Sequence, residues 1–282
     1  MAREPHLVTA DADRPLRAAA VFVAVTFLIA AGVYLPAIAS DRGWIGVTVP
    51  SGLVLVGVLS PGIATVVIHL HDDGVAGVRR VFGWLAAWRF GRGWWGVAVA
   101  LPPVFIAGYL AAYVGLGHEV SLEPPGVGVE TGGMVVLLAI LTAVTAVGEE
   151  IGWRGHLLPL LQARMSAVWA SLLLGGIWAV WHVPLFIGFE GLALPLRLLS
   201  IVGGAVVYTW LFNNTGGSVL AVTLLHFGTN MWARLVGLSG APPPTDTPAA
   251  AAFAAVNLLV AAVVLVGFGG ATLTGRRSPP GG

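Results

Sequence analysis

Eight long apolar stretches constrain this chain more than any other feature. A transmembrane helix needs about 20 predominantly apolar residues, and the stretches that qualify run approximately over residues 16–39, 51–70, 94–114, 134–161, 167–188, 196–212, 218–238 and 249–273. Charged residues make up only 10% of the chain, against roughly 25% in a soluble domain, so the chain lacks the polar residues that cover a water-facing surface. We therefore expect an all-α polytopic membrane protein, a bundle of about eight transmembrane helices.

The distribution of arginine predicts the orientation of this bundle. Cytoplasmic loops of membrane proteins are enriched in basic residues. Three arginines lie within the first 17 residues, four in the loop 72–93 and two at 276–277, whereas the loop 115–133 has none. All the arginine-rich segments fall on one side of an eight-helix bundle, so we expect a multi-pass protein of the cell membrane with both termini cytoplasmic. The predicted organisation is a cytoplasmic tail over 1–15, a single transmembrane domain over 16–273 and a second cytoplasmic tail over 274–282.

Composition and missing motifs exclude several chemistries. The chain contains no cysteine, and its 14 basic residues are all arginine, which excludes thiol nucleophiles and lysine-based catalysis. No HExxH sequence occurs and no aspartate lies inside a predicted span, so a two-histidine zinc helix and a pair of catalytic aspartates are both missing. A GLSG sequence covers 237–240, but no histidine follows its serine. A net charge of +1 gives no general attraction for nucleic acid.

Strongly polar residues inside the predicted spans form a short, clustered set. Such residues are costly in a membrane and are candidates for function by default. The fourth span contains Glu149, Glu150, Arg154 and His156, the fifth contains His182, and the seventh contains His226, Asn230 and Arg234. At 1.5 Å per residue, Glu149, His182 and His226 lie about 18, 23 and 12 Å from the cytoplasmic ends of their spans. All three fall in the middle of a hydrocarbon core of roughly 30 Å, so we expect them to meet in one cavity.

The spacing of these residues predicts different roles. Glu150 and Arg154 at i and i+4 share a helix face, which predicts an ion pair that locks the bundle. Glu149 points about 100° away from Glu150, so it stays free to act as a general base or a metal ligand. His226 and Asn230 are also four residues apart, and their N–H groups suit the stabilisation of an oxyanion.

Other residues near this cluster have mainly structural interpretations. His182, taken alone, is compatible with a hydrogen-bonding strut. His156 is either such a strut or, at i+7 from Glu149, a partner that supports this carboxylate. Gly148 and Gly152 have the small-xxx-small spacing that predicts close approach of a neighbouring helix.

Three short motifs, each in a separate span, carry the polar residues. The first is EExxxR at 149–154. The second is FxxxH, which ends at His182 and has Trp178 in place of the usual phenylalanine. The third is HxxxN, formed by His226 and Asn230. In order and spacing this combination, over residues 149–230, resembles the CPBP family, the CAAX-prenyl-protease and bacteriocin-processing membrane proteins also called Abi. We expect Trp178 to fill the apolar volume of the usual phenylalanine and to leave catalysis little affected.

The resemblance implies an intramembrane endopeptidase of the CAAX-protease-like type, which hydrolyses a peptide bond of a membrane-associated protein or peptide. It implies that Glu149 and His182 activate the attacking water. His226 and Asn230 would polarise the scissile carbonyl and hold the oxyanion. The Glu150–Arg154 ion pair would support them.

The sequence leaves metal use open. The family is classed with the metallopeptidases, and a glutamate mechanism without metal has also been argued for it. Glu149, His182 and His226 offer three ligands for Zn²⁺ and leave a fourth position for water, while the same residues suit metal-free general-base catalysis.

The expected partners are the lipid bilayer and a membrane-embedded or lipidated peptide or protein substrate, with no nucleic acid. One alternative is a non-catalytic membrane scaffold or bacteriocin self-immunity protein of the same family. Another is a small transporter with a buried Glu/His relay.

Overall fold

The computed structural model of the chain describes residues 13–120, 122, 129–187, 191–238 and 245–274, and every element in these ranges is a helix. The longer helices are α2 (Arg14–Asp41), α4 (Ser60–Gly83), α5 (Arg92–Gly115), α6 (Val129–Glu150), α8 (Ala167–His182), α9 (Ala193–Asn214), α10 (Val219–Leu238) and α11 (Thr247–Phe268). The short ones are η2 (Ser51–Leu53), α3 (Val54–Val58), η3 (Trp84–Ala86), η4 (Ile151–Leu157), α7 (Leu158–Gln162) and η5 (Val183–Phe186). The all-α prediction is confirmed. Most of both predicted tails and the serine of the GLSG sequence lie outside the described residues.

Seven helical segments in the described ranges are long and apolar enough to cross a membrane. Their outer surfaces carry large apolar side chains, for example Leu28, 73% exposed, and Val266, 90% exposed. A wide apolar surface of this kind is unfavourable in water and suits contact with lipid. A helix also satisfies its backbone hydrogen bonds internally, as a lipid environment requires. The chain is therefore a multi-pass membrane protein.

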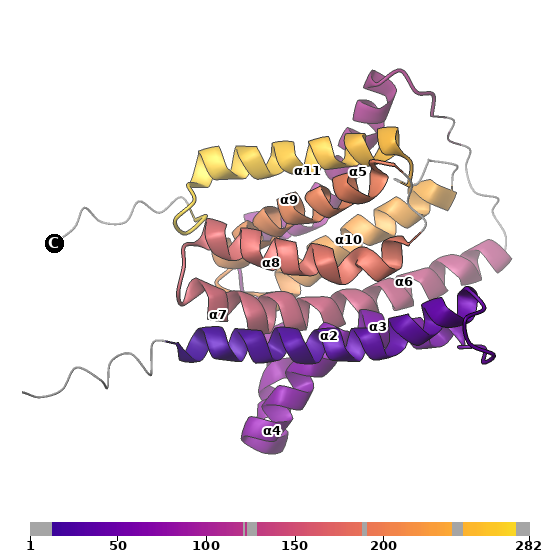
Figure 1. The fold of residues 1–282 in the computed structure, drawn as a ribbon. Coiled ribbons are helices and arrows are strands. Elements are labelled where there is room, and N and C mark those ends of the chain that lie inside the picture. The colour runs from indigo at the N-terminus through magenta and orange to yellow at the C-terminus, as the bar shows by residue number, and fades with distance from the viewer. Residues whose placement is uncertain (1–12, 121, 123–128, 188–190, 239–244, 275–282) are drawn as a thin grey trace, which may run out of the picture.

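The predicted span 51–70 does not form a continuous apolar helix. It is divided among η2, α3 and the beginning of α4. Pro61 supplies no backbone N–H at the start of α4, which favours a break in the helix at that point. Further along, α4 is kinked at Gly74, where φ is 60°, and it leaves the bundle at a steep angle (Figure 1). The expected eighth spanning helix is thus replaced by a broken segment.

The remaining helices pack so that α9 lies deepest in the bundle. More than half of its apolar window, 56%, is buried, against 28–39% for the other six candidate spans. It packs against α8 and α11, while α10 packs against α5 and α6. The described chain begins in α2 and leaves α11 at the same end of the bundle (Figure 1). Ser218, at the start of α10, donates a hydrogen bond to the carbonyl of Ala87, just before α5, so these segments meet as well.

The helix that carries the first motif changes its winding directly after the two glutamates. Residues Ile151–Leu157 form a π-helix, in which the N–H of Leu158 donates to the carbonyl of Trp153. Pro159 has no N–H to continue an α-helical ladder through this segment. Gly152 lies against the backbone of Pro61 at the start of α4, and a Cβ atom there would be 2.6 Å from the Pro61 carbonyl carbon. The predicted close approach of a neighbouring helix is therefore confirmed.

Candidate active site

The three motifs bring their polar side chains to one cavity inside the bundle. Glu149 lies at the end of α6, His182 is the last residue of α8, and His226 and Asn230 belong to α10. All four line a cavity of about 130 Å³. A buried water needs about 10–15 Å³ of such space, so the cavity has room for several water molecules. The structure thus brings the predicted site residues together, and their chemical roles remain predictions.

Glu150 joins the first motif to the third. Its carboxylate accepts hydrogen bonds from Arg154 Nη1 at 2.9 and 3.1 Å, and its Oε1 lies 2.7 Å from His226 Nδ1. The side chains of Glu150 and Arg154 are completely buried, so the predicted ion pair is present. The contact with His226 was not predicted, because it joins residues 76 positions apart. It turns Nε2 of the imidazole toward Glu149, where it lies 3.9 Å from Oε1.

Arg154 is held between two aromatic rings. Its guanidinium carbon lies 4.4 Å from the ring centres of both Trp178 and Tyr208. Contacts of a cation with ring faces are favourable and become stronger when water is excluded. They supplement the bond to Glu150, since Arg154 Nε and Nη2 are buried without a hydrogen-bond partner among the described residues.

Trp178 contacts the candidate catalytic carboxylate directly. Its indole Nε1 donates a hydrogen bond of 2.9 Å to Glu149 Oε2, and phenylalanine has no group that makes this bond. Trp178 therefore does more than fill the apolar volume of the usual phenylalanine, and its effect on catalysis stays a prediction. The motif pattern did not reveal the bond, because the pattern records an aromatic ring at this position and not where the indole N–H points.

One ring nitrogen of His182 is bonded to the backbone of its own helix. Its Nδ1 lies 2.9 Å from the carbonyl oxygen of Trp178, and only a protonated Nδ1 can donate to a carbonyl. Neutral His182 therefore carries its lone pair on Nε2. The 3₁₀ turn Val183–Phe186, which contains Pro184, follows directly after His182. This histidine is therefore the C-terminal residue of α8.

The charges of the cluster favour one proton shared between Glu149 and His226. Two carboxylates and one guanidinium, Arg154, give a net charge of −1 in a region where Glu149 is 4% and His226 5% exposed. An uncompensated charge is costly in a low-dielectric interior. One additional proton, either on His226 as imidazolium or on Glu149, makes the cluster neutral.

The proposed zinc ligands do not form a metal site in this arrangement. Within the described ranges, no group of three His, Cys, Asp or Glu side chains is arranged to hold a metal ion. Glu149 Oε2 and His226 Nδ1 are also engaged by Trp178 and Glu150. The donor types of Glu149, His182 and His226 suit zinc, so the use of a metal stays a prediction.

His156 does not support Glu149. Its Nδ1 lies 3.2 Å from Nε2 of His69 in α4, so it faces a different part of the bundle. The expectation of a shared face with Glu149 assumed an α-helix with i+7 periodicity. The π-helix at Ile151–Leu157 has a wider turn, so that periodicity does not hold across it.

Two other residues at the cavity were missed by the sequence interpretation, Tyr208 and Arg197, both on α9. The sequence could have pointed to Arg197, since a charged residue within an apolar span is uncommon. Tyr208 had none, because a tyrosine inside an apolar span is ordinary.

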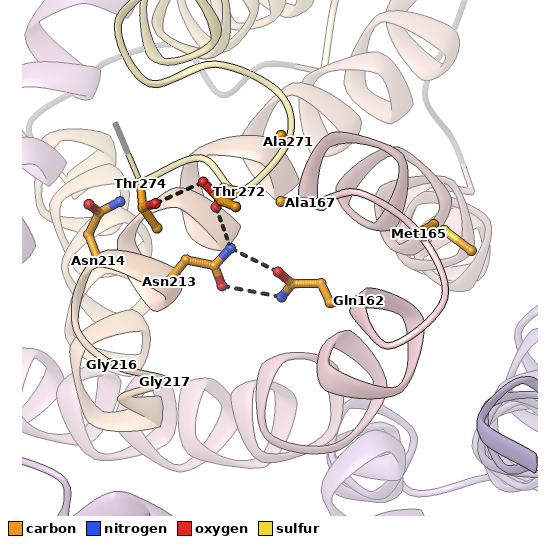
Figure 2. A pocket seen from close by; sticks show the side chains of 10 residues that line it. All are labelled: Gln162, Met165, Ala167, Asn213, Asn214, Gly216, Gly217, Ala271, Thr272 and Thr274. Carbon is orange, nitrogen blue, oxygen red and sulfur yellow. Dashed lines mark hydrogen bonds between the residues drawn. The ribbon is translucent and has the colours of Figure 1, made fainter. Parts of the chain in front are cut away.

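A larger hollow lies at the end of the bundle where the described chain begins and ends, and Figure 2 shows its polar side chains bonded to one another. It has a volume of about 550 Å³. Gln162 and Asn213 exchange hydrogen bonds of 3.2 and 2.9 Å, and Asn213 also donates to the carbonyl of Thr272. These contacts fasten α7 and α9 to the segment after α11. The hollow has no histidine or carboxylate in its lining, so we place the chemistry at the smaller cavity.

The part of the chain that carries the three motifs is similar to known proteins. Residues 131–232 match the family model described as Type II CAAX prenyl endopeptidase Rce1-like. A curated protein of Methanococcus maripaludis, CAAX prenyl protease 2, is 32% identical over 114 residues, which cover 37% of this chain and 41% of that protein. The match thus spans about two fifths of the relative's length. Residues 131–232 contain all three motifs, so the similarity to the Rce1-like CAAX prenyl endopeptidases covers the whole candidate site.

Proposed function

We propose that the protein is an intramembrane endopeptidase that cleaves a membrane-associated protein or peptide. The observation that carries the proposal is the position of Glu149. It is buried on the wall of a cavity with room for several water molecules, with Oε2 held by Trp178 and Oε1 toward the imidazole of His226. A carboxylate that is oriented by one bond and keeps a second oxygen available has the geometry of a general base.

In this mechanism Glu149 removes a proton from a water molecule in the cavity, and the water oxygen attacks the scissile carbonyl carbon. A C–O bond forms, and the carbonyl electrons move to the oxygen. His182 has a ring nitrogen available to orient the same water. Collapse of the intermediate breaks the C–N bond, and Glu149 returns its proton to the leaving nitrogen. The products are a carboxylic acid and an amine.

The oxyanion would be stabilised from α10. Asn230 supplies an amide N–H. His226 supplies Nε2–H only when it is protonated, because its Nδ1 proton is directed to Glu150. The imidazolium is the one of the two neutral forms of the cluster that leaves Glu149 ionised as a base, so the same proton balances the resting charge and serves the oxyanion. Glu150 and Arg154 position His226 and do not contact the substrate in this scheme.

The proposed mechanism passes through no metal, and it is supported by the side-chain positions, which form no three-ligand group among the described residues. We therefore expect hydrolysis to persist in 1,10-phenanthroline. Loss of activity in the chelator that Zn²⁺ restores would contradict the metal-free mechanism.

The direct test uses purified protein in phosphatidylcholine nanodiscs with a fluorogenic farnesylated peptide that ends in a CaaX sequence. Glu149→Gln should abolish cleavage without loss of thermal stability. The matched control is Glu119→Gln, which changes an exposed glutamate after α5. Equal cleavage by wild type and Glu149→Gln would refute the role of Glu149. A Glu149→Gln protein that keeps its biological phenotype would favour the scaffold or self-immunity alternative.

A further inference from the structure

Arg197 is a second arginine on the wall of the candidate catalytic cavity, and the proposed chemistry does not use it. It lies in the second turn of α9 and lines the same cavity as Glu149, His182 and His226. Arg154 is paired with Glu150. For Arg197, no Asp or Glu partner is found within the described part of the chain.

The surroundings of Arg197 leave two of its buried nitrogens without an acceptor. Its guanidinium carbon lies 4.4 Å from the ring centre of Phe253 and 5.3 Å from that of Phe186. These rings cover the faces of the group and offer no acceptor at its edge. Nε and Nη1 are buried, and neither has a hydrogen-bond partner among the described residues. A buried charge with unpaired donors is costly, and inside a membrane protein it marks a site for an anion.

We propose that Arg197 binds the free α-carboxylate at the C-terminus of the substrate, a proposal that rests on the proposed peptidase function. The guanidinium forms a planar fork that matches a carboxylate with two parallel hydrogen bonds. The two buried nitrogens that lack partners, Nε and Nη1, lie on different edges of that fork, and each forms its edge together with Nη2. Asn257 also lines this cavity, and its Nδ2 donates a hydrogen bond to the backbone carbonyl of Phe253.

The position of Phe186 fits a short C-terminal segment. Its ring centre lies 5.4 Å from that of His182 and 5.3 Å from the guanidinium carbon of Arg197, so this carbon lies within about 11 Å of the His182 ring centre. An extended chain covers at most about 3.3–3.6 Å per residue, so about three residues are enough to join a scissile bond near His182 to a carboxylate at Arg197. A substrate with a much longer tail would have to bend to place both groups.

Binding to a Glu149→Gln background tests this proposal without turnover. The probe is a fluorescent farnesylated peptide that ends in a CaaX sequence, prepared as the free acid and as the C-terminal amide, with the protein in phosphatidylcholine nanodiscs. With Arg197 present, we expect the acid to bind roughly 10- to 100-fold more tightly than the amide. Arg197→Gln should make the two affinities equal, and Arg197→Lys should give an intermediate ratio. The control Arg164→Gln, at an exposed position before α8, should keep the preference.

Several outcomes would overturn the assignment. They are equal binding of acid and amide with Arg197 present, no binding of either, or an undiminished preference in Arg197→Gln. Loss of the preference on adding phosphatidylglycerol would assign Arg197 to a lipid phosphate instead. Failure of the proposed function is distinguishable, because an Arg197-dependent preference in a protein that cleaves nothing would support this carboxylate site and contradict the peptidase activity.

Discussion

At the level of single residues, Glu150 connects the parts of the candidate site. It accepts bonds from Arg154 and His226 at once, so one side chain fixes a neighbouring turn of its own helix and the orientation of an imidazole on α10. Neither partner is exposed enough for water to replace the bond.

Replacement of Arg154 by alanine leaves Glu150 buried with an uncompensated charge. We expect the free energy of unfolding to fall by about 3–5 kcal/mol, measured by thermal or chemical denaturation in detergent. Arg164→Ala serves as the control, since Arg164 is exposed. Equal stability of Arg154→Ala and wild type would refute the structural role of the ion pair.

Replacement of Trp178 by phenylalanine separates volume from hydrogen bonding. The ring that covers Arg154 is kept, and the donor to Glu149 Oε2 is lost. A hydrogen bond to a charged group contributes about 1.5–3 kcal/mol, so kcat should fall roughly 10- to 100-fold, with little change in KM. Trp169→Phe is the matched control, because Trp169 is 65% exposed. Full activity of Trp178→Phe would restore the volume-filling interpretation.

The sequence predicted which residues meet at the cavity, but not how they bond. The meeting of Glu149, His182 and His226 could be predicted because each falls in the middle band of the hydrocarbon core when its depth is counted along its predicted apolar stretch. The bonds from Trp178 to Glu149 and from His226 to Glu150 depend on how neighbouring helices are rotated about their axes. Motif spacing within one helix contains no information on that rotation.

At the level of secondary-structure elements, the contact between Gly152 and α4 fixes the helix that carries both glutamates. A methyl group at this position meets the backbone of Pro61, which cannot move as a side chain can. Gly152→Ala should therefore reduce the free energy of unfolding by about 1–3 kcal/mol. Gly176→Ala in α8 is the control, because a Cβ atom there meets nothing within 4 Å. Equal effects of the two substitutions would show that helix propensity, and not the close contact, determines stability.

The elements themselves differ in how well the sequence predicts them. Long uninterrupted apolar stretches formed long helices. The stretch 51–70 did not, because Pro61 lies within it and the helix that follows it carries polar residues and a kink at Gly74. The π-helix after Glu150 was also not predictable, since an apolar periodicity of 3.6 residues describes only regular α-helix.

At the level of the whole molecule, orientation in the membrane follows from the ends of the bundle. The described chain begins and ends at one end (Figure 1), and the arginine-rich loops predict that this end is cytoplasmic. Because the chain has no cysteine, single cysteines can be introduced at Ala163, before α8, and at Glu119, after α5. In sealed right-side-out vesicles, an impermeant maleimide should label Glu119→Cys and spare Ala163→Cys until the membrane is opened. The reverse pattern would contradict the predicted orientation.

The central claim, that Glu149 drives proteolysis inside the membrane, is tested most directly by mapping protein N-termini. Membranes are compared from cells that express wild type, Glu149→Gln or the control Glu119→Gln at matched levels. We expect new N-termini with wild type and with Glu119→Gln that are absent with Glu149→Gln, a few residues from the C-termini of membrane-associated proteins. Identical maps for all three proteins would contradict the assignment of an endopeptidase.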